Sequence, residues 1–215
     1  MERLTEQLKK WSGKFGNEYT ERNSLTIQDV EDSYKKKYGT TRTNINEEFL
    51  FDINKDVKIL EVGCNIGNQL ILLKEMGFKN LYGIEISAYA IGVAEGRMER
   101  EGINLIKGSA LDIPFREEYF DLVYTSGVLI HIHPEHIEKA ISEIYRCSKR
   151  YIWGLEYYAE SYQEIVYRGH KDLLWKTDFS KIYQKTFPDL KLLKEKKFVY
   201  LENKDLEDSM FLLEK

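Results

Sequence analysis

The sequence predicts an α/β fold: a doubly wound, mostly parallel seven-stranded sheet with a C-terminal antiparallel hairpin and an N-terminal helical lid. From residue 57 to residue 155, short apolar runs alternate with amphipathic segments. That order is typical of right-handed crossovers and a parallel sheet covered on both faces. Near the C-terminus, two apolar runs flank a polar link that is too short to hold a crossover helix, which predicts the hairpin.

Composition narrows the class of protein. The 215 residues are 42% hydrophobic, enough to bury one sizeable core. The 32 Lys and Arg are outnumbered by 36 Asp and Glu, which argues against nucleic acid as a partner. Two cysteines make neither a disulfide framework nor a four-thiolate zinc site. No run approaches the ~20 apolar residues of a membrane-spanning helix. We expect a cytoplasmic monomer or homodimer that contacts no membrane.

The first 50 residues are expected to form the helical lid. Apolar side chains recur there at helical spacing: Leu4, Leu8, Trp11 and Phe15. A polar stretch over 17–24 follows, Thr26 is placed to cap a second helix, and Gly39 is placed to end it. A third short helix is expected over 46–50. The division is therefore predicted at residue 50, with 51–215 as the α/β domain.

The elements of the α/β domain are expected in strict alternation. The predicted strands cover 57–61, 81–85, 104–107, 120–124 and 151–155. The predicted helices cover 69–76, 87–101 and 134–147. Gly77 and Gly102 follow the first two helices, and Pro134 opens the third, as helix ends and starts favour. The hairpin strands are expected over 198–201 and 210–213.

The turn after the first predicted strand is the most informative segment. It contains Glu61, Gly63, Cys64, Asn65 and Gly67. A glycine-rich turn at that point lets a ligand approach the backbone, and the following helix offers the positive end of its dipole. The spacing does not match the G-x-G-x-x-G of dinucleotide-binding proteins. A plain tight turn between strand and helix is the alternative interpretation.

Further polar residues follow the next strands. Glu85 ends the second strand, where a carboxylate can accept both hydroxyls of a ribose, although a surface glutamate is the alternative. Asp112 follows the third strand, where it either binds a ligand or caps the turn before Pro114. Ser126 and Gly127 follow the fourth strand. Because the carboxyl ends of parallel strands share one edge, these residues are expected to lie close together.

These four segments, from residue 57 to about 131, resemble the class I S-adenosylmethionine-dependent methyltransferases. Their nucleoside-binding loop reads E-x-G-x-G-x-G, and here Asn65 takes the middle glycine position. The resemblance implies a Rossmann-like methyltransferase domain over 51–215 with S-adenosylmethionine as cofactor. It implies that Asp112 meets the adenine amine and that Ser126 and Gly127 lie beside the sulfonium. The cofactor-binding residues expected are Tyr19, Arg42, Glu61, Gly63, Cys64, Asn65, Gly67, Glu85, Ile86, Ala110, Leu111, Asp112, Ser126 and Gly127.

The flanking segments resemble a narrower group, the methylases associated with pseudaminic-acid biosynthesis. The segments that carry this resemblance are spread over nearly the whole chain: 20–23, 61–68, 126–132, 143–148, 151–158, 173–176 and 210–215. The resemblance implies a small-molecule acceptor, derived from a sugar of surface-glycan (polysaccharide) biosynthesis. Methylation at oxygen is the expectation.

His131, Glu156 and Tyr157 are the candidate catalytic residues, because they follow the fourth and fifth strands. Methyl transfer from a sulfonium mainly needs alignment and exclusion of water, but a weak oxygen nucleophile can also need a base. For His131 the alternative is a loop histidine bonded to a backbone carbonyl. The run 131–136 invites a metal interpretation, yet Pro134 breaks it and no distant ligand is evident. No metal is expected.

The lid supplies the remaining candidates. The guanidinium of Arg42 can clamp the methionyl carboxylate, and a surface arginine in a flexible arm is the alternative. Trp11, Trp153 and Trp175 either line the acceptor pocket or belong to the core. Three rival functions stay open: methylation of a protein or RNA, a nucleoside-binding module without turnover, and a dinucleotide oxidoreductase.

Overall fold

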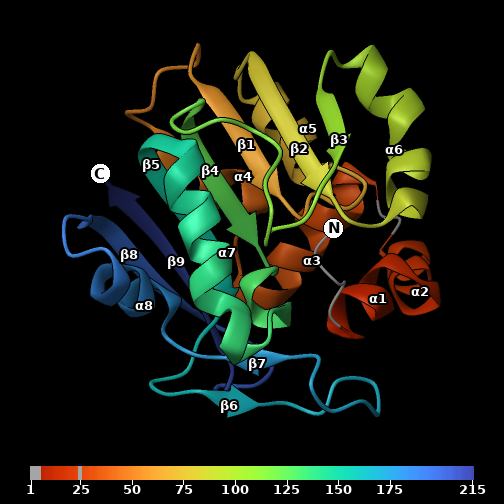
Figure 1. The fold of residues 1–215 in the computed structure, drawn as a ribbon, viewed down its shortest axis with the longest axis vertical. Helices are drawn as coiled ribbons and strands as arrows, with labels where there is room; N and C mark the ends of the chain where they lie inside the picture. Colours follow the sequence, from red (N-terminus) through yellow and green to blue (C-terminus); the bar gives the residue numbers. More distant parts are fainter. Residues whose placement is uncertain (1–5, 24–25) are drawn as a thin grey trace.

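The computed structural model describes residues 6–23 and 26–215, and Figure 1 shows the order of their elements. Helices come first: α1 (Glu6–Ser12), α2 (Lys14–Arg22), α3 (Ile27–Tyr38) and α4 (Arg42–Leu50). Strands then alternate with helices: β1 (Lys58–Val62), α5 (Asn68–Glu75), β2 (Asn80–Glu85), α6 (Ala88–Arg100), β3 (Asn104–Lys107), β4 (Phe120–Ser126), α7 (Pro134–Cys147) and β5 (Ser148–Tyr157). The remainder holds β6 (Gln163–Glu164), β7 (Trp175–Lys176), α8 (Phe179–Thr186), β8 (Lys191–Val199) and β9 (Glu207–Glu214).

The sheet has seven strands in the order β3-β2-β1-β4-β5-β9-β8. Strands β1 to β5 pair in parallel, whereas β9 runs antiparallel to both β5 and β8. The predicted fold class, including the C-terminal hairpin, is therefore confirmed. The strand order reverses between β1 and β4, because β2 and β3 lie on the opposite side of β1.

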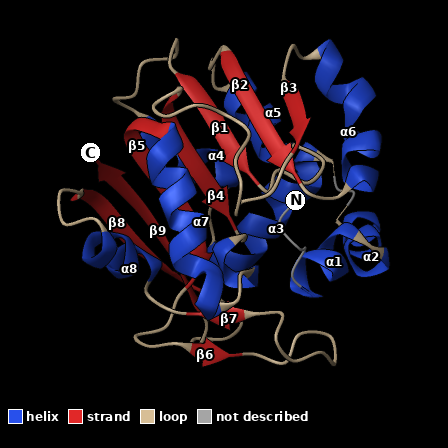
Figure 2. Ribbon diagram, viewed as in Figure 1, coloured by secondary structure: helices blue, strands red, loops and turns tan. Residues whose placement is uncertain are grey.

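Helices cover both faces of the sheet. Successive side chains along a strand point to opposite faces, so each strand contributes to the core on both sides. Helices α4 and α5 pack on one face, against a row of side chains from four central strands: Ile59, Leu122, Trp153 and Leu212. Helices α7 and α8 pack on the other face, against the adjacent residues: Leu60, Val123, Ile152 and Leu213. In Figure 2, α7 crosses in front of the sheet while α4 and α5 lie behind it.

The N-terminal helices differ from the expectation in two places. The first predicted helix is broken at Gly13 into α1 and α2. Helix α2 continues through Arg22, so residues 17–22, expected as a polar stretch between two helices, are helical. Those residues are helical because Gly16 and Thr20, one turn apart, are buried while their polar neighbours face outward. A Cβ on Gly16 would meet the Trp11 carbonyl oxygen at 1.8 Å, so only glycine fits there. Leu4 lies outside the described residues.

The second and third helices follow the capping signals. Thr26 accepts the Asp29 N–H in a capping box, and Gly39 ends α3 with φ +77°, as predicted. Helix α4 begins at Arg42, earlier than expected, because Thr41 caps it. Ile45 and other α4 side chains belong to the same core cluster as the sheet. The division of the chain at residue 50 stays a prediction.

The region after β5 holds the elements that the sequence did not predict. Helix α8 is amphipathic, with Phe179 and Tyr183 buried one turn apart and Asp178 as its N-cap, so its signal was present and was missed. Strands β6 and β7 have only two residues each, too few to show a period. Strand β8 begins at Lys191, in a lysine-rich run that is polar because β8 is an edge strand with exposed faces. It ends at Val199, so residues 200–201 lie outside it.

At Gly154 of β5, the packing of the sheet leaves no room for a side chain. A Cβ there would meet the Phe211 ring of β9 at 2.3 Å. Gly154→Ala should lower the free energy of unfolding by about 1–3 kcal/mol through overpacking. Denaturant titration measures it. Gly92→Ala on α6 is the matched control, because no atom lies within 4 Å of its Cβ position. It should raise stability by up to about 1 kcal/mol; equal effects of the two substitutions would contradict the packing argument.

Candidate functional site

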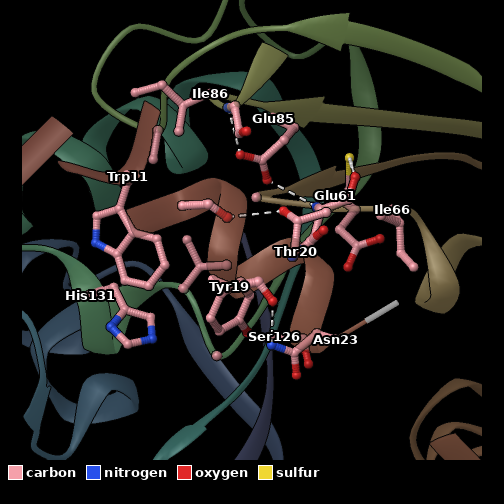
Figure 3. A pocket seen from close by; sticks show the side chains of 18 of the residues that line it. Trp11, Tyr19, Thr20, Asn23, Glu61, Ile66, Glu85, Ile86, Ser126 and His131 are labelled. Carbon is pink, nitrogen blue, oxygen red and sulfur yellow. Dashed lines mark hydrogen bonds between the residues drawn. The ribbon is translucent and has the colours of Figure 1, made fainter. Parts of the chain in front are cut away.

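A cavity of about 330 Å³ lies at the carboxyl ends of β1, β2 and β4. It sits where the strand order reverses, the position at which open α/β sheets bind ligands. The loops after the three strands form one wall, and side chains of α1, α2 and α3 form the other, among them Trp11, Tyr19 and Tyr34. Figure 3 shows part of this lining.

Most of the residues predicted from the sequence line this cavity. They are Tyr19, Glu61, Gly63, Cys64, Asn65, Glu85, Ile86, Ala110, Leu111, Ser126, Gly127 and His131. Arg42, Gly67, Asp112, Glu156 and Tyr157 do not line it. Sequence reasoning missed several lining residues, mainly from the lid: Gln7, Leu8, Asn23, Val30 and Tyr34. The amphipathic pattern of the lid helices indicated a packed face but not what that face covers.

The turn after β1 has the backbone that its glycines imply. Gly63 and Gly67 have φ of +73° and +76°, and Asn65 between them has φ +46°. A Cβ on Gly63 would meet Val128 at 2.6 Å, and one on Gly67 would meet Met98 at 2.7 Å. Gly67 is the N-cap of α5, so it shapes the turn from outside the cavity. Asn65 replaces a glycine here because asparagine tolerates the left-handed region.

Glu85 ties this turn to the end of β2. Its Oε2 accepts the Asn65 N–H at 2.9 Å and its Oε1 accepts the Ser87 N–H at 2.8 Å (Figure 3). Burial raises the pKa of Glu85, and these backbone hydrogen bonds oppose the shift. A carboxylate has about four lone-pair sites, so each oxygen can still accept a hydrogen bond from a ligand.

The described lining of the cavity contains acidic side chains but no Lys or Arg. Glu61 is only 3% exposed, its Oε2 has no hydrogen-bond partner among the described residues, and burial raises its pKa to about 8. Glu85 is the second carboxyl group, and none of the described residues lining the cavity is Lys or Arg. A ligand with positive charge therefore suits this cavity better than an anion.

The position of Arg42 differs from the prediction. It is fully buried, its Nη1 donates to the Tyr34 hydroxyl at 2.9 Å, and its guanidinium lies 5.5 Å from the Trp153 ring centre. Its side chain is thus behind Tyr34 and supports the cavity wall, instead of clamping a carboxylate inside it. The alternative of a surface arginine is also wrong. Trp153 is in the core.

Asp112 also lies elsewhere than expected. Its side chain is exposed, and its N–H donates to the Ser109 carbonyl at 3.1 Å. The turn directs Ser109, Ala110 and Leu111 to the cavity and Asp112 away from it. Asp112 is therefore part of the turn and lies outside the cavity, whereas its capping of the turn before Pro114 stays a prediction.

His131 lines the cavity in a defined tautomer. Its Nδ1 lies 2.7 Å from the Leu173 carbonyl oxygen. Because a carbonyl only accepts, Nδ1 carries the proton and Nε2 keeps a free lone pair. Burial lowers the pKa of His131 to about 4, so the ring is neutral at pH 7. The bond to a backbone carbonyl, expected as an alternative to catalysis, coexists with a place in the cavity.

Glu156 and Tyr157 are not in the cavity, which corrects their expected position. Glu156 is 2% exposed, and its carboxylate accepts the Val128 N–H at 3.1 Å and the Ile130 N–H at 3.4 Å. It holds the loop that carries His131, since the N–H groups of this turn need an acceptor. Burial raises its pKa to about 7. The Tyr157 ring lies 5.3 Å from Lys37 Nζ, and burial raises its pKa to about 12.

Gln7 fastens the lid to the same loop. Its side-chain NH₂ donates to the His131 carbonyl oxygen, and its Oε1 accepts the His133 N–H at 2.9 Å. The Trp11 ring centre lies 4.4 Å from that of His131, and Tyr19 packs on Trp11 at 5.3 Å. A single amide thus holds α1 over the cavity.

Residues 6–23 and 26–215 hold neither a metal-binding cluster nor a helix suited to a membrane. No three His, Cys, Asp or Glu side chains in these ranges gather closely enough to hold a metal ion. Among the helices described there, none combines the length and apolar character needed to cross a membrane.

The raised pKa of Glu61 predicts a pH dependence of stability. Between about pH 4.5 and 8 the folded state keeps the proton that the unfolded state releases, so the free energy of unfolding should fall as pH rises. Glu61→Gln, which removes this proton release and preserves the shape, should make that fall smaller. Denaturant titrations across this interval measure it. Parallel pH curves for the two proteins would show that Glu61 does not titrate in this way.

Comparisons with known proteins agree with this geometry. Residues 60–151 match the family model described as a methyltransferase domain. A sterol 24-C-methyltransferase of Pneumocystis carinii is 31% identical over 129 residues, which cover 54% of this chain and 34% of that enzyme. A phosphoethanolamine N-methyltransferase of Plasmodium falciparum is 23% identical over 193 residues, which cover 71% and 72%. The chain spans less than half the length of the first curated relatives it matches.

Solved structures show the same fold. Magnesium protoporphyrin IX methyltransferase of Synechocystis, solved with bound SAH, superposes with a TM-score of 0.71 at 14% identity and covers 97% of this chain and 98% of that one. The matched segment 60–151 begins in β1, contains the glycine turn and the end of β2, and reaches β5. Over residues 60–151 the chain is therefore similar to methyltransferase domains, and its fold is that of the solved methyltransferase.

Proposed function

We propose that the protein transfers a methyl group from S-adenosylmethionine to a hydroxyl oxygen of a small, polar, sugar-derived acceptor of surface-glycan biosynthesis. The observation that carries this proposal is the cavity itself, in which a left-handed glycine turn, a backbone-held carboxylate and a neutral imidazole meet under a closed lid. The sugar pathway is supported by the resemblance that spans nearly the whole sequence.

The residues of the cavity fit the cofactor. Glu85 is positioned to accept hydrogen bonds from the ribose hydroxyls, and the glycine turn leaves room for the nucleoside against its backbone. Ala110 and Leu111 offer apolar surface to the adenine ring. Glu61, with an oxygen that no described residue binds, is available to the ammonium group. A sulfonium and an ammonium suit a cavity whose described lining includes Glu61 and Glu85 but no Lys or Arg.

The residues of this chain align the cofactor with the acceptor, limit the access of water and provide a proton acceptor. S-adenosylmethionine, when bound, supplies a methyl group already activated by its sulfonium. The Gln7 contact and the Trp11 and Tyr19 rings cover one side of the cavity, where they would limit the access of water. Nε2 of His131 is unprotonated and can take the proton of an acceptor hydroxyl. Glu156 holds the loop so that this nitrogen stays in place.

The size of the cavity favours a small acceptor. With the lid in place the volume is about 330 Å³, near the lower end of the roughly 300–1,000 Å³ typical of ligand pockets. A folded protein or an RNA helix cannot enter it without displacing α1 and α2. The relatives act on different acceptors by their names, a sterol and phosphoethanolamine, so the acceptor has to be argued from the site.

Two measurements test the function. Calorimetry with S-adenosylmethionine measures cofactor binding, and incubation with methyl-labelled cofactor and small-molecule extracts of glycan-producing bacteria measures transfer. We expect binding and a labelled sugar product. Binding without any labelled product would favour the nucleoside-binding module, and label in protein or RNA would favour those acceptors. Binding of NAD(H) instead of S-adenosylmethionine would favour a dinucleotide oxidoreductase over a methyltransferase.

Glu85→Ala should weaken cofactor affinity, because the paired hydrogen bonds to the ribose are lost. Hydrogen bonds to a charged group contribute about 1.5–3 kcal/mol, which corresponds to a loss of about 10-fold to 100-fold. Calorimetry measures the affinity. Glu95→Ala, at an exposed position of α6, is the control and should bind as the parent does. Unchanged affinity in folded Glu85→Ala would remove Glu85 from the site.

His131→Ala should slow methyl transfer by about 10²–10⁴-fold, the usual contribution of general acid–base catalysis, with cofactor affinity nearly kept. Labelled-methyl incorporation measures the rate. His136→Ala is the control, because His136 does not line the cavity; its ring lies 6.1 Å from that of His133. Full turnover in His131→Ala would rule out the role of a base.

A further inference from the structure

The segment between β5 and α8 contains a β-hairpin, residues 163–176, which we call the hairpin arm. Strands β6 and β7 pair antiparallel at its base, and Tyr167 and His170 exchange backbone hydrogen bonds of 2.8 and 2.9 Å near its tip. Between them, Arg168 and Gly169 have φ of +51° and +80°, as in the two-residue turns that hairpins favour. In Figure 1 the arm lies outside the main sheet, and its loop extends below the lid helices α1 and α2.

The tip of the hairpin arm contacts both the lid and the loop that carries His131. The Tyr167 ring centre lies 5.4 Å from that of His131, which lines the cavity. On the lid side, the Phe15 ring of α2 lies 6.1 Å from Tyr167 and 5.4 Å from His170. The Arg168 guanidinium carbon lies 5.9 Å from the centre of the Tyr167 ring. One aromatic ring therefore contacts both this cation and the imidazole of the cavity.

The same tip carries two cations without an anionic partner. Arg168 and Lys171 are exposed, and in the part of the chain that the structure describes neither forms an ion pair. Of the two acids in the arm, Glu164 is bonded to the backbone, since its Oε1 accepts the Asp172 N–H at 2.8 Å. No atom lies within 4 Å of the Cβ position of Gly169, so the turn is not covered by other parts of the described chain.

The cavity and the tip of the arm have opposite charge. The described lining of the cavity includes Glu61 and Glu85 but no Lys or Arg, which suits the sulfonium and ammonium of the cofactor. An anionic group inside it would meet these acids without a counter-ion, and a buried unpaired charge is strongly disfavoured. Arg168 and Lys171 offer a guanidinium fork and an ammonium outside the cavity. A negative charge on the acceptor is therefore better placed at the tip than in the cavity.

A phosphate matches this pair of cations better than a carboxylate does. A phosphate monoester carries a charge of about −2 and three acceptor oxygens, so it can bind a guanidinium and an ammonium together. A carboxylate has a single charge, which one guanidinium already balances. In a sugar phosphate the phosphate and the free hydroxyls are attached to different ring carbons. One hydroxyl can therefore enter the cavity while the phosphate stays outside.

Resting on the function proposed above, we propose that the acceptor is a phosphorylated sugar whose phosphate binds Arg168 and Lys171 at the tip of the hairpin arm. The hydroxyl to be methylated then lies at His131, inside the cavity. The arm thus selects an anionic acceptor, while the acid-lined cavity selects the cationic cofactor.

The first test measures the charge of the methylated product. The intact protein is incubated with methyl-labelled S-adenosylmethionine and the small-molecule extract, and the labelled product is passed over an anion exchanger. We expect the label to be retained, and its retention to fall after treatment with phosphodiesterase and phosphatase. A labelled product that is neutral from the start, or whose retention does not change on this treatment, would overturn the proposal.

A matched pair of variants tests the arm itself. Arg168→Gln should raise the KM for the phosphorylated acceptor about fivefold or more, with kcat and S-adenosylhomocysteine affinity nearly kept, because the lost contact lies outside the cavity. Arg116→Gln is the control. Arg116 is also exposed and lies 5.5 Å from a tyrosine ring, that of Tyr119, but it precedes β4, at the edge of the sheet opposite the cavity. Equal KM values in the two variants would overturn the role of Arg168.

Salt provides a second readout, which a general loss of structure would not reproduce. The KM of the parent should rise from about 0.05 M to about 0.5 M NaCl, because salt screens exposed charges, and the rise should be smaller in Arg168→Gln. An equal rise in both proteins would contradict the proposal. Failure of S-adenosylmethionine to bind, or the absence of any labelled product, would instead overturn the proposed function, so the two failures are distinguishable.

Discussion

The partly buried carboxylate of Glu85 is the constraint on which the cavity depends. It accepts backbone N–H groups from the turn after β1 and from the residue that caps α6, so one side chain joins two strand ends. The left-handed φ of Gly63 and Gly67 turns the chain so that the Asn65 N–H points at this carboxylate. Because backbone donors fix it, the carboxylate is oriented before any ligand arrives, which reduces the entropy lost on binding.

Glu156 repeats the same device on the next pair of strands. Its carboxylate, at the end of β5, accepts N–H groups of the loop after β4, and that loop carries His131. The imidazole is fixed from the other side by the Leu173 carbonyl. Gln7 then binds the backbone at His131 and His133, so the lid closes on a loop that is already rigid. The carboxylates of Glu85 and Glu156 hold the backbone on the sheet side of the cavity, and the Gln7 amide binds α1 to the loop that carries His131.

Much of the fold was predictable because most of the helices and the central strands have local signals of their own. Thr26 and Gly39 mark the ends of α3, and the apolar runs mark the central strands. The glycine turn and Glu85 were predictable because backbone geometry and strand position are written locally. The positions of Arg42 and Glu156 were not, because which buried partner satisfies a charged side chain depends on packing between elements distant in sequence.

The lid was the hardest part to derive, since Gln7 binds residues more than a hundred positions away and no local pattern marks it. The most direct test of the whole account is a crystal structure of the protein with S-adenosylhomocysteine. It should place both ribose hydroxyls within hydrogen-bond distance of the Glu85 carboxylate and the sulfur toward His131. An adenosyl group bound outside this cavity, or a ribose that does not contact Glu85, would contradict it.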